Sequence, residues 1–149
     1  MRFMMILKAS KNSEAGVMPS AELLTAMGHY NQTLINAGVL LDAAGLQASS
    51  KGVRVDFRAG KRIVTDGPFA ESKELIAGFW MIQVKSKEEA VEWARRCPDP
   101  MPGEDAQIEL RQVFEAADFG AAFTPELREA EERMRAHLIE SGKPLTARP

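Results

Sequence analysis

Near the middle of this 149-residue chain stands the stretch Val64-Thr65-Asp66-Gly67-Pro68-Phe69-Ala70-Glu71-Ser72-Lys73-Glu74. It combines a turn, an aromatic residue and four charged residues of both signs. Gly67 supplies backbone freedom and lies before Pro68, where the helical conformation is disfavoured. The stretch therefore predicts a junction, with a hairpin before it and a strand after it.

Strands are predicted on both sides of this junction. Residues 75–84 form the most apolar run of the chain and predict a central strand. Residues 3–7 are continuously apolar and predict a strand that is buried on both faces, or nearly so. A further strand is predicted to start at residues 39–41 and to continue or bend at 45–46, and a last one runs from residue 108 to about 114.

The hairpin is predicted from period-two alternation just before the junction. Residues 53–58 alternate apolar and charged side chains, which indicates one buried and one wet face. Residues 59–60 form a turn, and residues 61–65 return as the partner strand.

Three helices are predicted from their caps and apolar spacing. One begins at Ser20 and ends at Gly38, after a loop over residues 9–18. A second begins at Ser86, with Glu89 completing a capping box, and stops at Pro98. The third begins at Thr124 and carries a narrow apolar stripe on an otherwise charged surface, so it needs a partner surface. Residues 142–149 are predicted to be frayed.

The order of elements predicts an α+β fold: a ferredoxin-like β-α-β-(β-hairpin)-β-α-β unit over residues 1–115, with a linker and an amphipathic helix over residues 116–149. Two helices can cover only one face of the sheet, yet the central strand is apolar on both faces. The simplest cover for the second face is another copy of the chain, which predicts a homodimer.

Composition excludes several classes of function. A formal net charge of −2 offers no electrostatic argument for binding nucleic acid or a membrane surface. Two His and one Cys provide no metal-ligand spacing, and neither a phosphate loop nor a dinucleotide fingerprint is present, so we expect no metal and no cofactor. The apolar start is too short for a secretory signal, and no run reaches membrane-span length. We expect a cytoplasmic protein.

These residues resemble the YCII-related proteins of the DGPF subgroup, whose name matches Asp66-Gly67-Pro68-Phe69. The resemblance covers roughly residues 1–115 and is carried by residues 3–7, 37–41, 45–46, 65–74, 78–79, 89–90, 93–94, 97–98 and 109–111. It implies a dimeric α+β barrel of ferredoxin-like units and no established reaction. Members look enzyme-like, and some are associated with alternative sigma factors, so a sigma factor is a possible partner.

One departure from the family pattern bears on chemistry. The resemblance to the YCII branch implies a His on the first helix and an Asp after the second. Aligned on Leu40-Leu41 and Trp93-Ala94, this pair falls at about Met27 and Cys97. His29 is two residues away, about 200° around the helix. The chain is therefore expected to lack this dyad.

Asp66 is the first candidate for a catalytic residue because it ends a strand at a turn, where functional groups often lie. Its carboxylate could accept a proton or bind a cationic ligand. The structural alternative is an Asx-turn, in which the side chain caps its own backbone.

Further candidates are Glu71 and Lys73, which could line a pocket beside Asp66, with the lysine holding an anionic group. The alternative is a solvated loop with weak surface ion pairs. His29 could act as a general base, although it lies away from the apolar stripe, and an exposed histidine without a catalytic role is the favoured interpretation. His137 is a weaker candidate.

Arg54, Arg58 and Arg111 lie opposite apolar positions of their strands, so they either ring a barrel pocket or face solvent. Cys97 follows Arg95-Arg96, and nearby cations lower a thiol pKa. Without a positioned histidine, a buried structural cysteine is the favoured interpretation.

Three hypotheses for function follow. The first is a cofactor-independent enzyme that acts on a small organic molecule in the barrel pocket through Asp66. The second is a non-catalytic ligand-binding or regulatory module that works with a transcription factor. The third is an interaction protein that docks through its C-terminal helix.

Overall fold

The computed structural model describes residues 1–70 and 73–141. The chain divides into two compact units, Met1–Arg111 and Gln112–Pro149, and each is described by itself.

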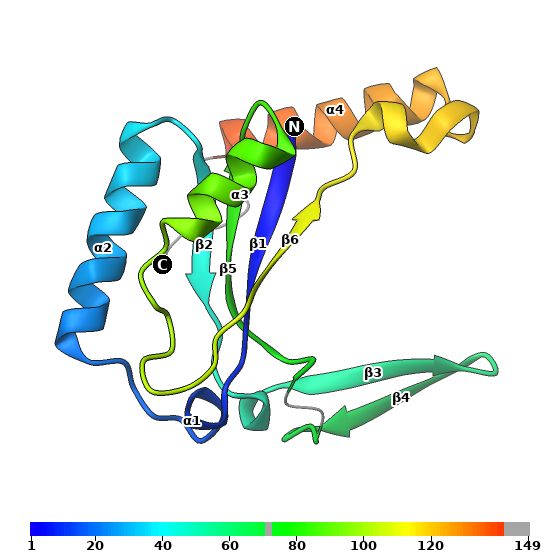
Figure 1. Ribbon diagram of the computed structural model, residues 1–149. Coiled ribbons are helices and arrows are strands. Elements are labelled where there is room, and N and C mark those ends of the chain that lie inside the picture. Colours follow the sequence, from blue (N-terminus) through cyan, green and yellow to red (C-terminus); the bar gives the residue numbers. More distant parts are fainter. Residues whose placement is uncertain (71–72, 142–149) are drawn as a thin grey trace. The chain divides into compact units, whose positions relative to one another are not determined.

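A four-stranded sheet organises the first unit (Figure 1). Its strands lie in the order β2 (Leu40–Gly45), β5 (Ile76–Gln83), β1 (Arg2–Lys8) and β6 (Ile108–Gln112). β5 is antiparallel to both of its neighbours. The predicted central strand is therefore confirmed, as are the α+β class and the order of the core elements.

Two helices cover one face of this sheet, and both begin where serine caps predict. α2 (Ala21–Asn36) begins after Ser20, whose side chain accepts a hydrogen bond from the Leu23 N–H. α3 (Lys87–Arg95) begins after Ser86, which accepts from the Glu89 N–H. The reciprocal half of the predicted capping box is not formed there, because the Glu89 carboxylate accepts from the Lys85 N–H instead.

A short helix, α1 (Lys11–Glu14), corrects the prediction of a continuous loop over residues 9–18. Ser10 and Ser13 form its capping box: each side chain accepts a hydrogen bond from the backbone N–H of the other residue. Local serine hydrogen bonds were enough to close one helical turn without an apolar stripe.

The core lies between the sheet and the two helices. Alternate residues of β1 and β5 pack against side chains of α2 and α3, and the cluster includes Phe3, Met5, Leu7, Trp80, Ile82, Tyr30, Leu34, Ala90 and Trp93. The Tyr30 hydroxyl donates to the Trp93 carbonyl at 2.7 Å, and the Trp80 indole N–H donates to the Asn31 amide oxygen at 2.8 Å. These bonds satisfy the polar atoms of the buried aromatic residues and tie α2 to α3 and β5.

The second face of the sheet carries the remaining residues of β1 and β5. Met4 lies opposite Met81, and Ile6 lies opposite Phe79. All four side chains are half-buried, so the prediction that residues 3–7 are buried on both faces holds fully for one face only. Alternation along the strands explains the difference, because α2 and α3 both pack on the first face.

The predicted hairpin is present as β3 (Val53–Arg58) and β4 (Lys61–Asp66). It forms a separate two-stranded sheet instead of joining the other four strands. For this reason the predicted burial of its apolar face is wrong within one chain. Val53, Val55 and Phe57 are 57%, 47% and 71% exposed.

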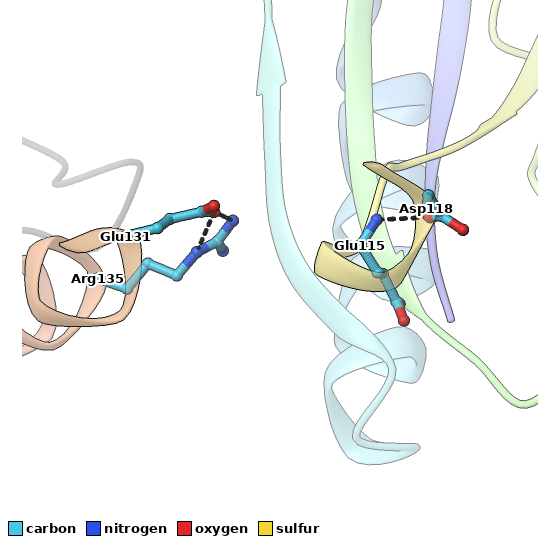
Figure 2. A network of polar contacts seen from close by, with 4 residues as sticks. All are labelled: Glu115, Asp118, Glu131 and Arg135. Carbon is cyan, nitrogen blue, oxygen red and sulfur yellow. Dashed lines mark hydrogen bonds and ion pairs between the residues drawn. The ribbon is translucent and has the colours of Figure 1, made fainter. Parts of the chain in front are cut away.

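The second unit contains 3-10 turns within Ala116–Ala122, interrupted by a kink at Gly120 (φ 61°, ψ −152°), and α4 (Pro125–Glu140). Thr124 caps α4 and Pro125 is its first residue, as predicted. The ring of Phe119 contacts those of Phe114 and Phe123, with centroids 5.1 and 5.5 Å apart. In this unit the Glu115 N–H donates to Asp118, and Arg135 pairs with Glu131 one turn earlier (Figure 2).

The apolar stripe of α4 is largely exposed, with Leu127 at 51% and Met134 at 61%. Each helix in residues 1–70 and 73–141 is too short or too polar to cross a membrane.

Candidate functional site

The loop after β4 presses closely against the turn that precedes β3. The Gly67 N–H donates to the Gly52 carbonyl at 2.9 Å. A Cβ atom on Gly67 would lie 1.8 Å from the carbonyl oxygen of Ser49, which belongs to the 3-10 helix Ser49–Lys51. A glycine is therefore required here by close approach between two backbones.

Hydrogen bonds through Ser49 hold this loop to α1. The Ser49 hydroxyl donates to the Glu14 carboxylate at 2.5 Å and accepts from the Phe69 N–H at 3.1 Å. The Ser49 N–H also donates to Glu14, at 3.1 Å. A charged acceptor makes these bonds stronger than neutral ones. Ser49 thus joins three segments that are far apart in sequence: α1, its own turn and the loop after β4.

Phe69 anchors the loop to the hairpin. The guanidinium carbon of Arg54 lies 4.0 Å from the centre of the Phe69 ring, a cation–π contact. Phe69 itself is half-buried. Gly67 and Phe69 belong to the Asp66-Gly67-Pro68-Phe69 motif, and both therefore stabilise the conformation of this loop.

Asp66 has a different position in the same motif. It is the last residue of β4, lies opposite Val53 and is exposed. The predicted alternative of an Asx-turn is not formed, because Pro68 has no N–H and the Phe69 N–H donates to Ser49. The described part of the chain offers the Asp66 carboxylate no hydrogen-bond or ion-pair partner. Asp66 is therefore available for a ligand or a partner.

Of the other predicted candidates, the structure describes Lys73 and His29, and neither makes a polar contact with Asp66. Lys73 is exposed in a turn, and His29 is exposed on α2. Glu71 lies outside the described residues. In the ranges that the structure describes, no hydrogen bond or ion pair joins Lys73 or His29 to Asp66.

Met27 and Cys97, the positions where the resemblance would place a His–Asp pair, both pack against the hydrophobic core. Burial raises the pKa of the Cys97 thiol to about 11, with a further contribution from the negative charge of Asp99. The guanidinium carbon of Arg96 lies 4.1 Å from the centre of the Trp93 ring. The thiol is protonated at neutral pH, which supports the structural interpretation of this cysteine.

Cys97 also lines an open pocket of about 350 Å³ between the end of α3 and the start of β6. Its walls are mostly apolar and are formed by Val91, Ala94, Arg95, Cys97, Pro100, Ala106, Gln107, Ile108 and Leu110. Asp66, Lys73 and His29 are absent from this lining. The Arg95 guanidinium beside it pairs with Glu92 at 3.1 Å.

A charged cluster lies at the β1–β6 side of the second face of the sheet. Lys8 Nζ is 2.8 Å from Glu109 Oε2, and Arg111 is 3.0 Å from Glu109 Oε1. Alternation places Glu109 and Arg111 on this face, because Ile108 and Leu110 pack toward the core. Of this cluster, sequence reasoning considered Arg111 alone. The polar positions of residues 108–111 were visible in the sequence, but the pairing of β6 with β1 was not.

The structure also places Arg54 and Arg58, the two arginines of the hairpin. Arg54 contacts Phe69, while Arg58 is exposed on the hairpin. Among residues 1–70 and 73–141, no group of three or more His, Cys, Asp or Glu side chains is arranged to hold a metal ion.

Hydrogen bonds from Lys8 and then Arg111, together with their charges, hold the pKa of Glu109 below its ordinary value. A carboxylate with a lowered pKa stabilises the folded state above its unfolded pKa of about 4.3 and loses this contribution as the pH falls through the folded pKa. We therefore expect Glu109→Gln to be less stable than the wild type near neutral pH. The difference should shrink between about pH 5 and pH 3.

Urea unfolding at several pH values measures this difference. Glu132→Gln, which removes one exposed carboxylate from α4, controls for the change in net charge. If the difference in the free energy of unfolding between Glu109→Gln and the wild type grows as the pH falls, the stabilising role of the cluster is contradicted.

The chain was compared with known proteins. The YCII-related domain matches residues 1–117. An uncharacterised protein of Rhizobium meliloti (strain 1021) is 38% identical over 68 residues, which are 46% of this chain and 55% of that protein. The chain spans about half the length of this curated relative. Since the domain covers most of the sequence, the chain belongs to the YCII-related family.

Proposed function

We propose that the protein binds a small organic molecule in a cavity that forms between two copies of the chain. Two ferredoxin-like units pair through the second faces of their sheets and build a dimeric α+β barrel. The observation that carries this proposal is the second face itself. It combines half-buried apolar side chains with a cluster of three charged residues.

The apolar part of that face supports pairing. Met4, Ile6, Phe79 and Met81 form a block on two adjacent strands, and a sheet buries such a block against another layer. Among the described helices of the first unit, α2 and α3 pack on the opposite face. A second copy supplies a matching layer by symmetry.

The charged part of the face supports ligand binding. Small-molecule sites are mostly apolar, with a few polar groups that orient the ligand. Lys8, Glu109 and Arg111 lie together at one side of the apolar block. They offer hydrogen-bond donors and an acceptor to a molecule with an apolar skeleton and a polar group.

Asp66 is the acid–base group of this proposal. It is exposed at the end of a strand, and the described residues offer it no partner. A carboxylate in that state can accept a proton from a bound molecule, in a proton-transfer or lyase-type reaction that needs no cofactor.

A non-catalytic role is the second candidate, and one observation favours it. Met27 and Cys97 pack against the core where a His–Asp pair would be needed, and the Cys97 thiol is protonated at neutral pH. In this case the dimer senses a small molecule and works with a transcription factor of the sigma class.

A metabolite library screened by thermal shift and by turnover separates these possibilities. The enzyme proposal expects a ligand that stabilises the wild type and is converted. Asp66→Asn should then abolish conversion and keep the fold, while Asp56→Asn on the same hairpin keeps activity. Stabilisation without conversion supports the non-catalytic role. Full activity of Asp66→Asn removes Asp66 from the mechanism, and a monomer in light scattering at micromolar concentration contradicts the barrel.

A further inference from the structure

The two faces of the β3–β4 hairpin differ in chemistry. The cross-strand register places Val53 opposite Asp66, Val55 opposite Val64 and Phe57 opposite Arg62. Opposite residues share a face of the sheet. We call this set the apolar hairpin face: Val53, Val55, Phe57, Arg62, Val64 and Asp66. The other face carries Arg54, Asp56, Arg58, Lys61, Ile63 and Thr65.

The apolar hairpin face is open to solvent within the described chain. Phe57 is 71% exposed and Val64 is 64% exposed. A contiguous apolar patch of this kind marks an interaction site, and an isolated two-stranded hairpin is marginally stable in water. The hairpin thus gains stability from whatever covers this face.

The other face is already engaged at the base of the hairpin. Arg54 lies on that face and stacks on Phe69, and the Gly67 N–H donates to Gly52. These contacts join the two ends of the hairpin, and the Phe69 N–H, which donates to Ser49, holds the base to the Ser49–Lys51 turn. In Figure 1, β3 and β4 run away from the end of the four-stranded sheet. The hairpin is therefore an arm with an anchored base and a free apolar face.

The charges of the apolar hairpin face are balanced. It carries Arg62 and Asp66, whereas Arg54, Arg58 and Lys61 lie on the other face. A mainly apolar surface with one charge of each sign suits an interface in which the same surfaces of two copies of the chain meet.

A match in charge between Asp66 and a cluster on the sheet also supports a second copy of the chain as the partner of the hairpin. Asp66 lies on the apolar hairpin face and has no ion-pair partner among the described residues. In the cluster on the second face of the sheet, two cations, Lys8 and Arg111, share the single carboxylate of Glu109. That cluster can accept one more carboxylate, and Arg111 has 72% of its side chain exposed.

We propose that the apolar hairpin face docks on a second copy of this chain and carries Asp66 to the Lys8–Glu109–Arg111 cluster of that copy. The ligand site is then composite, with the sheet of one chain and Asp66 of the other. This inference rests on the proposed homodimer. It adds that the hairpin makes part of the interface, that it docks through its apolar face, and that Asp66 comes from the chain opposite the sheet of the site.

Two neighbouring residues of β4 test the docking face. Val64→Lys places a charge on the apolar hairpin face, and Ile63→Lys places the same charge on the opposite face, one residue earlier. Both positions are exposed, at 64% and 44%. We expect Val64→Lys to raise the dimer dissociation constant about tenfold or more and Ile63→Lys to change it less than about threefold. Sedimentation equilibrium measures both, after circular dichroism has shown that both variants fold.

A double-mutant cycle tests the charge contact. Asp66→Asn and Arg111→Gln should each weaken the dimer, and together they should weaken it no more than the stronger single change, because both remove one interaction. If the two substitutions instead raise the dimer dissociation constant by factors that multiply in the double variant, the sites are independent and the placement of Asp66 is wrong.

The outcomes separate this inference from the proposed function. A wild-type monomer overturns both. A wild-type dimer that Val64→Lys and Ile63→Lys weaken equally, or leave intact, overturns the arm and leaves the barrel in place. Turnover of the Asp66→Asn variant is measured above its dimer dissociation constant, so that loss of chemistry is distinguished from loss of pairing.

Discussion

Replacing Ile82 with alanine is expected to lower the free energy of unfolding by about 2–5 kcal/mol. Ile82 is fully buried in the central strand β5, opposite Phe3 of β1 and Leu40 of β2. The truncated side chain leaves a cavity between the sheet and the helices, and the well-packed surroundings close only part of it. Urea unfolding followed by tryptophan fluorescence measures the loss, because Trp80 and Trp93 belong to the same core.

Ile76→Ala is the matched control, since it removes the same atoms from the same strand at a position that is 37% exposed. Its expected cost is about 1 kcal/mol or less, mainly from lower strand propensity. Equal losses for the two variants would contradict the placement of the core. Because Ile82 faces the helices, we also expect Ile82→Ala to keep the oligomeric state of the wild type below its melting temperature.

Replacing Gly67 with alanine is the second change with a large expected effect, a loss of roughly 1–3 kcal/mol from overpacking. The new Cβ atom would lie 1.8 Å from the oxygen and 2.7 Å from the carbon of the Ser49 carbonyl group. Neither backbone atom can retreat without disturbing the hydrogen bonds that tie Ser49 to Glu14 and Phe69. The loop must therefore move, and Asp66 moves with it. Ligand binding should weaken together with stability.

Gly28→Ala makes the same chemical change in α2, where nothing lies within 4 Å of the added atom. Alanine is the better helix former by about 0.5–1 kcal/mol, so this variant is expected to be more stable than the wild type. Thermal unfolding of both variants gives the comparison. If both substitutions stabilise the protein, the close contact between Gly67 and Ser49 is wrong.

Local sequence chemistry was sufficient for most of the elements. Ser20, Ser86 and Thr124 cap the helices that they were predicted to cap, because a hydroxyl needs only an N–H three residues later. Gly38 has a φ of 70° and lies where a left-handed residue was expected. Alternation and apolar runs located the six strands that the structure describes, and the resemblance that includes the motif around Asp66 indicated the family.

Two predictions were wrong for different reasons. The hairpin alternates like a half-buried strand, but burial depends on a covering layer that the described residues of one chain do not provide. The Asx-turn at Asp66 is not formed because Pro68 has no N–H, and the Phe69 N–H donates to Ser49, 20 residues earlier. The first error comes from a layer distant in sequence, and the second comes from the residue type at position 68.

Helix ends, strand positions and family membership thus followed from residues within a few positions of one another, where capping and alternation act. Only the tertiary structure decided that Lys8 meets Glu109 across β1 and β6, and that Ser49 links Glu14 to the loop of Phe69. These contacts join segments up to about a hundred residues apart, and, unlike the pairing within the β3–β4 hairpin, such distant pairings have no turn signal in the sequence. The role proposed for Asp66 likewise depends on a surface outside its own hairpin.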